Sequence, residues 1–151
     1  MQTRRKTLQH SAIVAGLLAA TGLFPSHALA FNAKAFDAKT MSDALKALGA
    51  AAPTESKDVT IIGPDIAENG AVVPLGASTT LAGVKQLLIL VEKNPSALVA
   101  AFNLTDSVDA NISTRAKMGQ SSDVYAVAIM NDGRALFAKK EVKVTLGGCG
   151  G

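Results

Sequence analysis

The single cysteine of the chain, Cys149, lies in the carboxyl-terminal sequence made of Gly147, Gly148, Cys149, Gly150 and Gly151. A thiol can attack an electrophile, form a disulfide or hold a covalently attached group. A cysteine that contributes to packing has apolar neighbours, and four glycines supply none. Because glycine tails also lack bulky side chains, we predict that residues 147–151 form a flexible arm. From Leu146, three extended residues carry the thiol at most about 10 Å, far enough to enter a narrow cleft.

Histidine is confined to the first thirty residues, at His10 and His27. If that segment is removed, the mature chain has no imidazole for a Ser-His-Asp or Cys-His nucleophile. It also lacks the usual histidine ligands of zinc and copper sites. We therefore assign no catalytic and no metal-binding residue to the chain, and we expect no cofactor.

The amino terminus has the organisation of an export signal. Basic Arg4, Arg5 and Lys6 precede an apolar stretch, which ends at the small-x-small sequence Ala28-Leu29-Ala30. The apolar stretch is shorter than the ~20 residues that cross a bilayer, so no membrane anchor is expected after cleavage. The adjacent arginines favour the twin-arginine route. We predict cleavage after residue 30 and a periplasmic location.

The charge balance changes once residues 1–30 are removed. The whole chain has 15 basic and 12 acidic residues, and three of the basic ones are Arg4, Arg5 and Lys6. The mature chain therefore has 15 − 3 = 12 basic and 12 acidic residues, which gives no basic surface for nucleic acid. Its length suits one domain, and a lone cysteine excludes an internal disulfide.

The thiol has no activating group within its own arm. A low thiol pKa needs a nearby cation, a helix amino terminus or a metal. The nearest cation in sequence is Lys143, and the terminal carboxylate would disfavour a thiolate. Activation must then come from a pocket that receives the arm, which describes a carrier better than an enzyme.

The mature chain is predicted to be an immunoglobulin-like antiparallel β-sandwich of about seven strands, spanning residues 31–146. Residues 36–50 read as a short helix that starts after Asp37 or Thr40 and ends at Gly49. Asn69-Gly70 and Asp132-Gly133 predict tight turns, and Pro74 predicts an edge or bulge. The predicted strands, separated by such turn residues, are 59–63, 71–78, 83–94, 97–105, 112–119, 123–131 and 135–146.

Three of these segments, 87–91, 97–102 and 124–130, are apolar on both faces of the strand. Sandwich strands that face water usually alternate apolar and polar residues. Two explanations are open: the amino-terminal helix and loops cover the outer face, or a partner subunit does. We favour the partner, because contiguous apolar surface usually marks an interface. Tyr125 and Val127 are the positions where a charge would test it.

The terminal motif Gly-Gly-Cys-Gly-Gly, the twin-arginine-like leader and the sequence PDIAENGAVVPL at 64–75 together resemble the SoxY family. SoxY proteins are the sulfur carriers of the periplasmic Sox system, which oxidises thiosulfate. The resemblance implies an immunoglobulin-like sandwich paired with a companion subunit, SoxZ. It implies that Cys149 carries sulfur intermediates covalently. It further implies transient docking to the cytochrome SoxAX, the hydrolase SoxB and the molybdenum dehydrogenase SoxCD. We assign no chemistry to segment 64–75.

Two other functions remain open on the residues alone. The first is an enzyme that uses Cys149 as its own nucleophile, which the missing histidines disfavour. The second is a periplasmic adaptor whose Cys149 only forms an intermolecular disulfide. Full function after replacement of that disulfide by a non-reducible crosslink would identify the adaptor.

Overall fold

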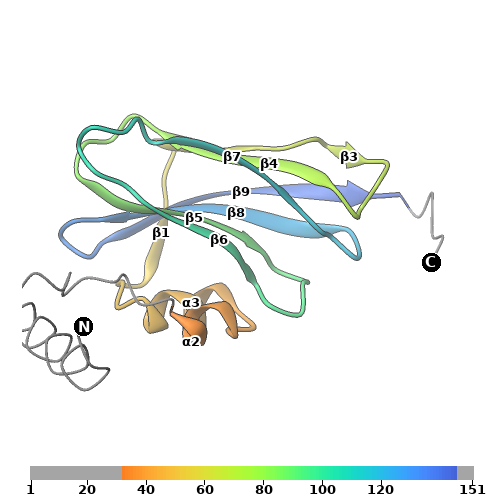
Figure 1. Cartoon of the computed structure of the whole chain (residues 1–151), viewed down its shortest axis with the longest axis horizontal. Helices are drawn as coiled ribbons and strands as arrows, with labels where there is room; N and C mark the ends of the chain where they lie inside the picture. The colour runs from red at the N-terminus through yellow and green to blue at the C-terminus, as the bar shows by residue number, and fades with distance from the viewer. Residues whose placement is uncertain (1–31, 146–151) are drawn as a thin grey trace, which may run out of the picture. The chain divides into compact units, whose positions relative to one another are not determined.

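The computed structural model of the chain describes residues 32–145. The predicted export signal, the arm at 147–151 and Cys149 itself lie outside these residues. Within them, two short helices precede nine strands arranged in two facing sheets (Figure 1). The larger sheet has the order β1-β9-β8-β5-β6, with β3 also paired to β9, and the smaller sheet has the order β2-β4-β7. This architecture confirms the predicted all-β sandwich.

Seven of the nine described strands coincide with predicted ones. The described strands are β1 (Pro53–Glu55), β2 (Val59–Ile62), β3 (Ile66–Ala67), β4 (Val73–Thr79), β5 (Val84–Val91), β6 (Leu98–Asn103), β7 (Asn111–Ala116), β8 (Ser122–Met130) and β9 (Ala135–Val144). The two that the sequence did not predict, β1 and β3, are three and two residues long and pair in parallel with β9. They add two short parallel pairings to an otherwise antiparallel sandwich.

The amino-terminal helical segment is two helices, α2 (Ala33–Phe36) and α3 (Met41–Ala47), where the sequence predicted one. Of the two residues predicted to start the helix, Asp37 and Thr40, it is Thr40 that forms the N-cap of α3. Its hydroxyl oxygen accepts from the Asp43 amide at 3.1 Å. Gly49 ends the helix in the left-handed conformation, with φ of 73°. The Gly49 and Ala50 amides then donate to the Lys46 and Leu45 carbonyls, which closes the last turn.

The turn between β8 and β9 forms where Asp132-Gly133 predicted it. Gly133 adopts a φ of 88°, a left-handed value that strains other residues. The Asp132 carboxylate accepts from the Arg134 amide at 3.0 Å and from its guanidinium at 2.7 Å. The hairpin registers β8 against β9 from Ile129 opposite Ala135 to Ser122 opposite Val142.

Pro74 lies in the central strand of the smaller sheet, yet at a position where only one neighbour pairs. The pairing of β2 with β4 ends at Ile62 opposite Gly76, two residues before the proline is reached. At Pro74 the paired strand is β7, through Arg115. At Pro74 one side of β4 therefore has no paired strand, which is the environment that proline requires. The strand β4 as a whole is nevertheless central in its sheet.

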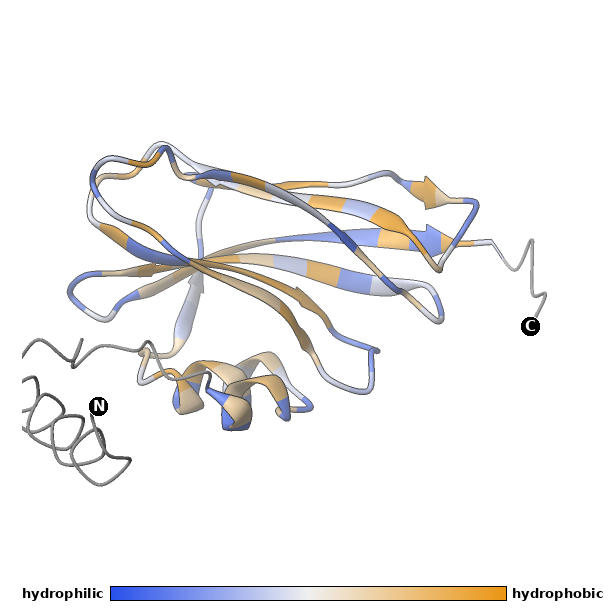
Figure 2. Cartoon of the chain, in the orientation of Figure 1, coloured by the Kyte–Doolittle hydropathy of each residue, from blue (hydrophilic) through white to orange (hydrophobic). Residues whose placement is uncertain are grey.

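The space between the two sheets is filled by alternate side chains of the central strands. Leu87, Ile89 and Val91 of β5 point inward beside Val124 of β8, and none of the four is exposed. Val73, Leu75 and Ala77 of β4 meet them from the smaller sheet. Figure 2 shows β5 and β6 apolar along most of their length, whereas β9 becomes hydrophilic toward its carboxyl end. This core fixes the register of the strands that lead to the arm.

The outer face of the larger sheet is covered by α2 and α3. The prediction that a partner subunit covers the apolar strands was therefore wrong for this face. Leu88, Leu90 and Val127 pack in one cluster with Leu45 of α3, and all four are at most 1% exposed. Figure 1 shows the helices on the face opposite the smaller sheet. A charge at Val127 would therefore disrupt the fold rather than report on a partner. Tyr125 is half-buried in the same cluster, against Phe137.

Candidate functional site

Cys149 and its four flanking glycines lie outside the described residues, so the structure shows the site through the strand that leads to it. That strand, β9, ends at Val144, and the described chain ends at Thr145. We call residues 143–145 the arm root. They are the last described residues before the predicted arm.

The arm root is held by hydrogen bonds from both sides. On one side, the Lys143 amide donates to the Asp65 carbonyl at 2.9 Å, and the Thr145 amide donates to the Ala67 carbonyl at 3.0 Å. On the other, the Val144 amide donates to the Ser121 hydroxyl at 2.9 Å. Since all three successive amides have partners, the arm starts from a fixed point.

An ion pair links the same segment to β9. The Lys140 ammonium donates to the Gly63 carbonyl at 2.6 Å and lies 2.9 Å from the Asp65 carboxylate. The hydrogen bond and the charge of Lys140 lower the pKa of Asp65 below its ordinary value. Because Asp65 is exposed, solvent screens the pair and it contributes little to stability. Its role is to orient the 63–67 segment along β9.

Gly70 makes the closest backbone approach near the arm root. Its carbonyl accepts from the Met118 amide at 2.7 Å. A β-carbon at this position would collide with the Met118 carbonyl oxygen and would come within 2.8 Å of Val144 Cγ1. The sequence indicated Gly70 only as part of a turn, and nothing local revealed this long-range contact. The segment 64–75, to which the sequence assigned no chemistry, thus holds the end of β9.

Exposed apolar side chains gather along the same segment. Ile62, Ile66 and Val72 are 49%, 57% and 51% exposed, and Ile66 pairs directly with Lys143 of the arm root. We call these three residues the apolar rim. Among the described residues only one other large apolar side chain is as exposed, Val108, which lies in the loop between β6 and β7. The rim is therefore a local feature of the end of the sandwich from which the arm leaves.

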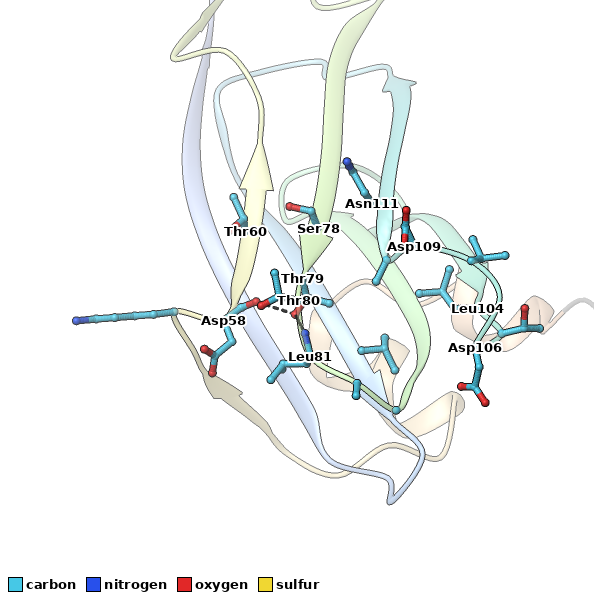
Figure 3. Close-up of a pocket in the computed structure, with 17 residues that line it drawn as sticks. Asp58, Thr60, Ser78, Thr79, Thr80, Leu81, Leu104, Asp106, Asp109 and Asn111 are labelled. Carbon is cyan, nitrogen blue, oxygen red and sulfur yellow. Dashed lines mark hydrogen bonds between the residues drawn. The ribbon is translucent and has the colours of Figure 1, made fainter.

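A groove of about 990 Å³ lies at the opposite end of the sandwich, between the loops after β4 and β6 and the start of β2 (Figure 3). Its polar groups are mainly hydroxyls and the carboxylates of Asp58, Asp106 and Asp109. The Thr79 hydroxyl there donates to the Asp58 carbonyl at 2.7 Å. The groove contains no nucleophile paired with a base.

Metal clusters and membrane-spanning helices are both absent from the part of the chain that the structure describes. Across residues 32–145, no group of three or more His, Cys, Asp or Glu side chains is arranged to hold a metal ion. No helix in this part of the chain is long and apolar enough to cross a membrane.

Comparisons with known proteins extend to part of the chain beyond the described residues. The family model described as "Sulfur oxidation protein SoxY" matches residues 44–149. Among solved structures, the sulfur carrier protein SoxY from Chlorobium limicola f. thiosulfatophilum is 31% identical, with a TM-score of 0.64. The match covers 71% of this chain and 97% of that one. No curated protein matches.

A more distant structural match concerns the fold alone. A superoxide reductase (neelaredoxin) variant from Ignicoccus hospitalis is 16% identical, with a TM-score of 0.51. The match covers 58% of this chain and 79% of that one. At this identity the likeness indicates a shared β-sandwich and nothing about chemistry.

Proposed function

The chain belongs to the SoxY family of sulfur carrier proteins, and we propose that it holds the intermediates of thiosulfate oxidation covalently on Cys149. A carrier of this kind is not itself an enzyme. The observation that supports Cys149 as the attachment point is the extent of the family match. It runs through residue 149 and so includes the thiol and two of its glycines.

The proposed chemistry starts with an S–S bond between Cys149 and thiosulfate. Forming that bond releases the thiol proton and two electrons, which the haem protein SoxAX would accept. Water then cleaves the terminal sulfone as sulfate, the step proposed for the hydrolase SoxB, and leaves a persulfide on Cys149. In hosts that have it, the dehydrogenase SoxCD would oxidise the remaining sulfane sulfur.

The anchored arm root limits where these enzymes can bind. From Thr145 to Cys149 there are four residues, which span at most about 14 Å when fully extended. A partner whose active site admits Cys149 must therefore lie against the end of the sandwich that carries the arm root. The apolar rim occupies that end, so it contacts each such partner in turn. Scattered apolar side chains of this kind suit brief contacts with several different enzymes.

The positions of the histidines and of one lysine support activation of the thiol by the partner. The chain has histidine only at His10 and His27, and both precede the proposed cleavage site after residue 30. On the strand that leads to the arm root, the Lys140 ammonium is committed to Asp65 and Gly63. A carrier benefits from this arrangement, because an unactivated thiol does not react before it reaches an enzyme.

The proposed setting is the periplasm, reached through the twin-arginine signal in residues 1–30. Twin-arginine export moves folded proteins, so a companion without its own signal, SoxZ, would travel in complex with this chain. Because α2 and α3 cover the outer face of the larger sheet, the companion binds elsewhere on the sandwich.

The experiment that tests the proposal compares Cys149→Ser with Gly148→Val in a reconstituted system. We expect Cys149→Ser to abolish thiosulfate-dependent electron transfer while the melting temperature stays unchanged. Gly148→Val is expected to slow the enzyme-coupled steps by obstructing entry, yet to leave the thiol equally reactive toward a small alkylating reagent. Activity retained by Cys149→Ser would refute the carrier function. Normal turnover by Gly148→Val would refute the entry of a narrow arm.

A further inference from the structure

Asn69 and Gly70, in the loop between β3 and β4, have the residue types of a site of spontaneous deamidation. In that reaction the backbone nitrogen of the following residue attacks the side-chain amide carbon, and glycine leaves this approach unobstructed. Residues 32–145 contain six asparagines, and among these Asn69 alone precedes a glycine. Asn69 is exposed, so water and hydroxide reach it. Figure 1 shows the loop beside the carboxyl end of β9.

The turn at 69–72 holds the reacting groups close together. The Ala71 amide donates to Asn69 Oδ1 at 2.9 Å, and the Val72 amide donates to the Asn69 carbonyl oxygen at 3.3 Å. The first bond closes an Asx turn, which folds the side chain back over the Gly70 amide. The Gly70 amide donates to no group within residues 32–145, so no described acceptor holds its proton.

The bond from Ala71 also lies where charge develops during the reaction. When the Gly70 nitrogen adds to Asn69 Cγ, the carbonyl electrons move onto Oδ1, and the Ala71 amide already donates to that atom. A preoriented donor at a developing oxyanion lowers the barrier of such an addition. The turn therefore supplies both the proximity of the groups and the stabilisation of the intermediate.

The Asp132-Gly133 pair in the β8–β9 turn provides a contrast. The Arg134 amide donates to the Asp132 carboxylate at 3.0 Å, and the Arg134 guanidinium donates to it at 2.7 Å. These bonds lower the pKa of Asp132, the backbone bond most, so the group stays ionised at neutral pH. A carboxylate anion is a poor electrophile, because its charge repels the attacking nitrogen. The same ring therefore does not close readily at Asp132.

We propose that Asn69 is a modification site that deamidates spontaneously, and that the isoaspartate formed there releases the arm root. The Gly70 nitrogen loses its proton to hydroxide and bonds to Asn69 Cγ, and the side-chain nitrogen leaves as ammonia. Water then opens the resulting succinimide at either of its two carbonyl carbons, with no oxidation or reduction. One product is aspartate with the original backbone. The other is isoaspartate, whose backbone passes through the former side chain and is longer by one carbon.

The longer backbone does not fit the packing around Gly70. The Gly70 carbonyl accepts from the Met118 amide at 2.7 Å, and even a β-carbon on Gly70 would collide with the Met118 carbonyl oxygen. The same β-carbon would come within 2.8 Å of Val144 Cγ1. A displaced Gly70 thus loses its bond to Met118 and pushes against the end of β9. The resulting loss of precise Cys149 delivery rests on the proposed carrier function.

The test incubates the purified chain at mildly alkaline pH and follows Asn69 by mass spectrometry. Trypsin releases residues 58–85, in which Asn69 is the only asparagine or glutamine, so conversion of an amide to an acid is assigned directly. The converted fraction should rise with time and with pH before any conversion is detected at Asn131. Methyl transfer from S-adenosylmethionine by a protein isoaspartate methyltransferase should identify isoaspartate in the same peptide.

Two variants separate the backbone change from the added charge. Asn69→Ser keeps an oxygen that accepts from the Ala71 amide but cannot deamidate. Freshly prepared Asn69→Asp has the charge without the longer backbone. Hydrogen exchange at the Val144 and Thr145 amides should accelerate in the aged parent chain in proportion to its isoaspartate. It should stay unchanged in aged Asn69→Ser and in fresh Asn69→Asp.

A functional measurement completes the test. Thiosulfate-dependent electron transfer in a reconstituted system should fall as the parent chain ages and should persist in aged Asn69→Ser. The mass spectra and exchange rates do not depend on sulfur chemistry, so failure of the carrier function would leave them unchanged. An Asn69 that stays unmodified, or isoaspartate that accumulates without faster exchange at Val144 and Thr145, would overturn the proposal.

Discussion

Replacing Gly70 by alanine should loosen the end of the sandwich that carries the arm. The added β-carbon would overlap the Met118 carbonyl oxygen and lie 2.8 Å from Val144 Cγ1, so the turn at 69–72 or the end of β9 must move. Overpacking of this kind typically costs about 1–3 kcal/mol. For a domain of this size, such a loss lowers the melting temperature by roughly 4–12 °C.

Gly119→Ala is the matched control for this variant. Gly119 lies in the loop that follows Met118, its backbone is not left-handed, and a β-carbon there meets nothing within 4 Å. Its melting temperature should stay close to that of the parent chain. Thermal unfolding followed by circular dichroism, together with hydrogen exchange at the Thr145 amide, measures both effects. Equal melting temperatures for the two variants would refute the close approach at Gly70.

Three further variants test other parts of the account. Leu45→Ala should lower the free energy of unfolding in urea by about 2–5 kcal/mol, because Leu45 is only 1% exposed. A loss of no more than about 0.5 kcal/mol, as at surface positions, would contradict the packing of α3 against the larger sheet. Ile66→Lys should raise the KM of an arm-receiving enzyme without changing stability, whereas Val108→Lys at the far end should not; equal effects would refute a localised rim. Lys140→Met should raise the pKa of Asp65, followed by NMR titration of its carboxyl carbon. Because the pKa of Asp65 is lowered in the folded state, any stability from the ion pair is present at neutral pH and is lost as the pH falls through this pKa. In Lys140→Met this acid-dependent loss of stability should disappear. An unchanged pKa of Asp65 in the variant would contradict the pairing.

The strands could be predicted where local residues determine them. Asp132-Gly133 specifies the β8–β9 turn, and the alternation of Val142 and Val144 with charged residues sets the register of β9. The short strands β1 and β3 could not be predicted, because they exist through pairing with β9 and carry almost no apolar pattern of their own. Their positions depend on contacts across some 75 residues of sequence or more.

The covered face of the larger sheet shows a second limit of the sequence pattern. Apolar residues on both sides of β5 and β8 correctly indicated that both faces are covered, but a pattern within a strand does not identify the covering element. Ala44 and Leu45 are the buried residues of α3. Their packing against Leu88 and Val127 requires the chain to return across the sheet, which only the three-dimensional structure displays.

The candidate site was predicted mainly from residue type, namely one cysteine between glycines. A lone thiol among glycines is distinctive in sequence, whereas its support is not. Ser121 holds the arm root through its hydroxyl, Ala67 through its backbone carbonyl and Gly70 through close approach. Backbone hydrogen bonds leave little trace in side-chain identity. The structural role of segment 64–75, which is to hold the end of β9, is therefore visible only in its contacts with that strand.

The most direct test of the carrier function is mass spectrometry of the carboxyl-terminal peptide from cells oxidising thiosulfate. The peptide that contains Cys149 should carry sulfur-containing adducts that a reductant removes, and the same peptide from cells grown without thiosulfate should carry none. Blocking the sulfate-releasing hydrolase should enrich the thiosulfate adduct over the persulfide. A peptide whose thiol is free, or is found only in a disulfide with another protein, under all of these conditions would contradict the account.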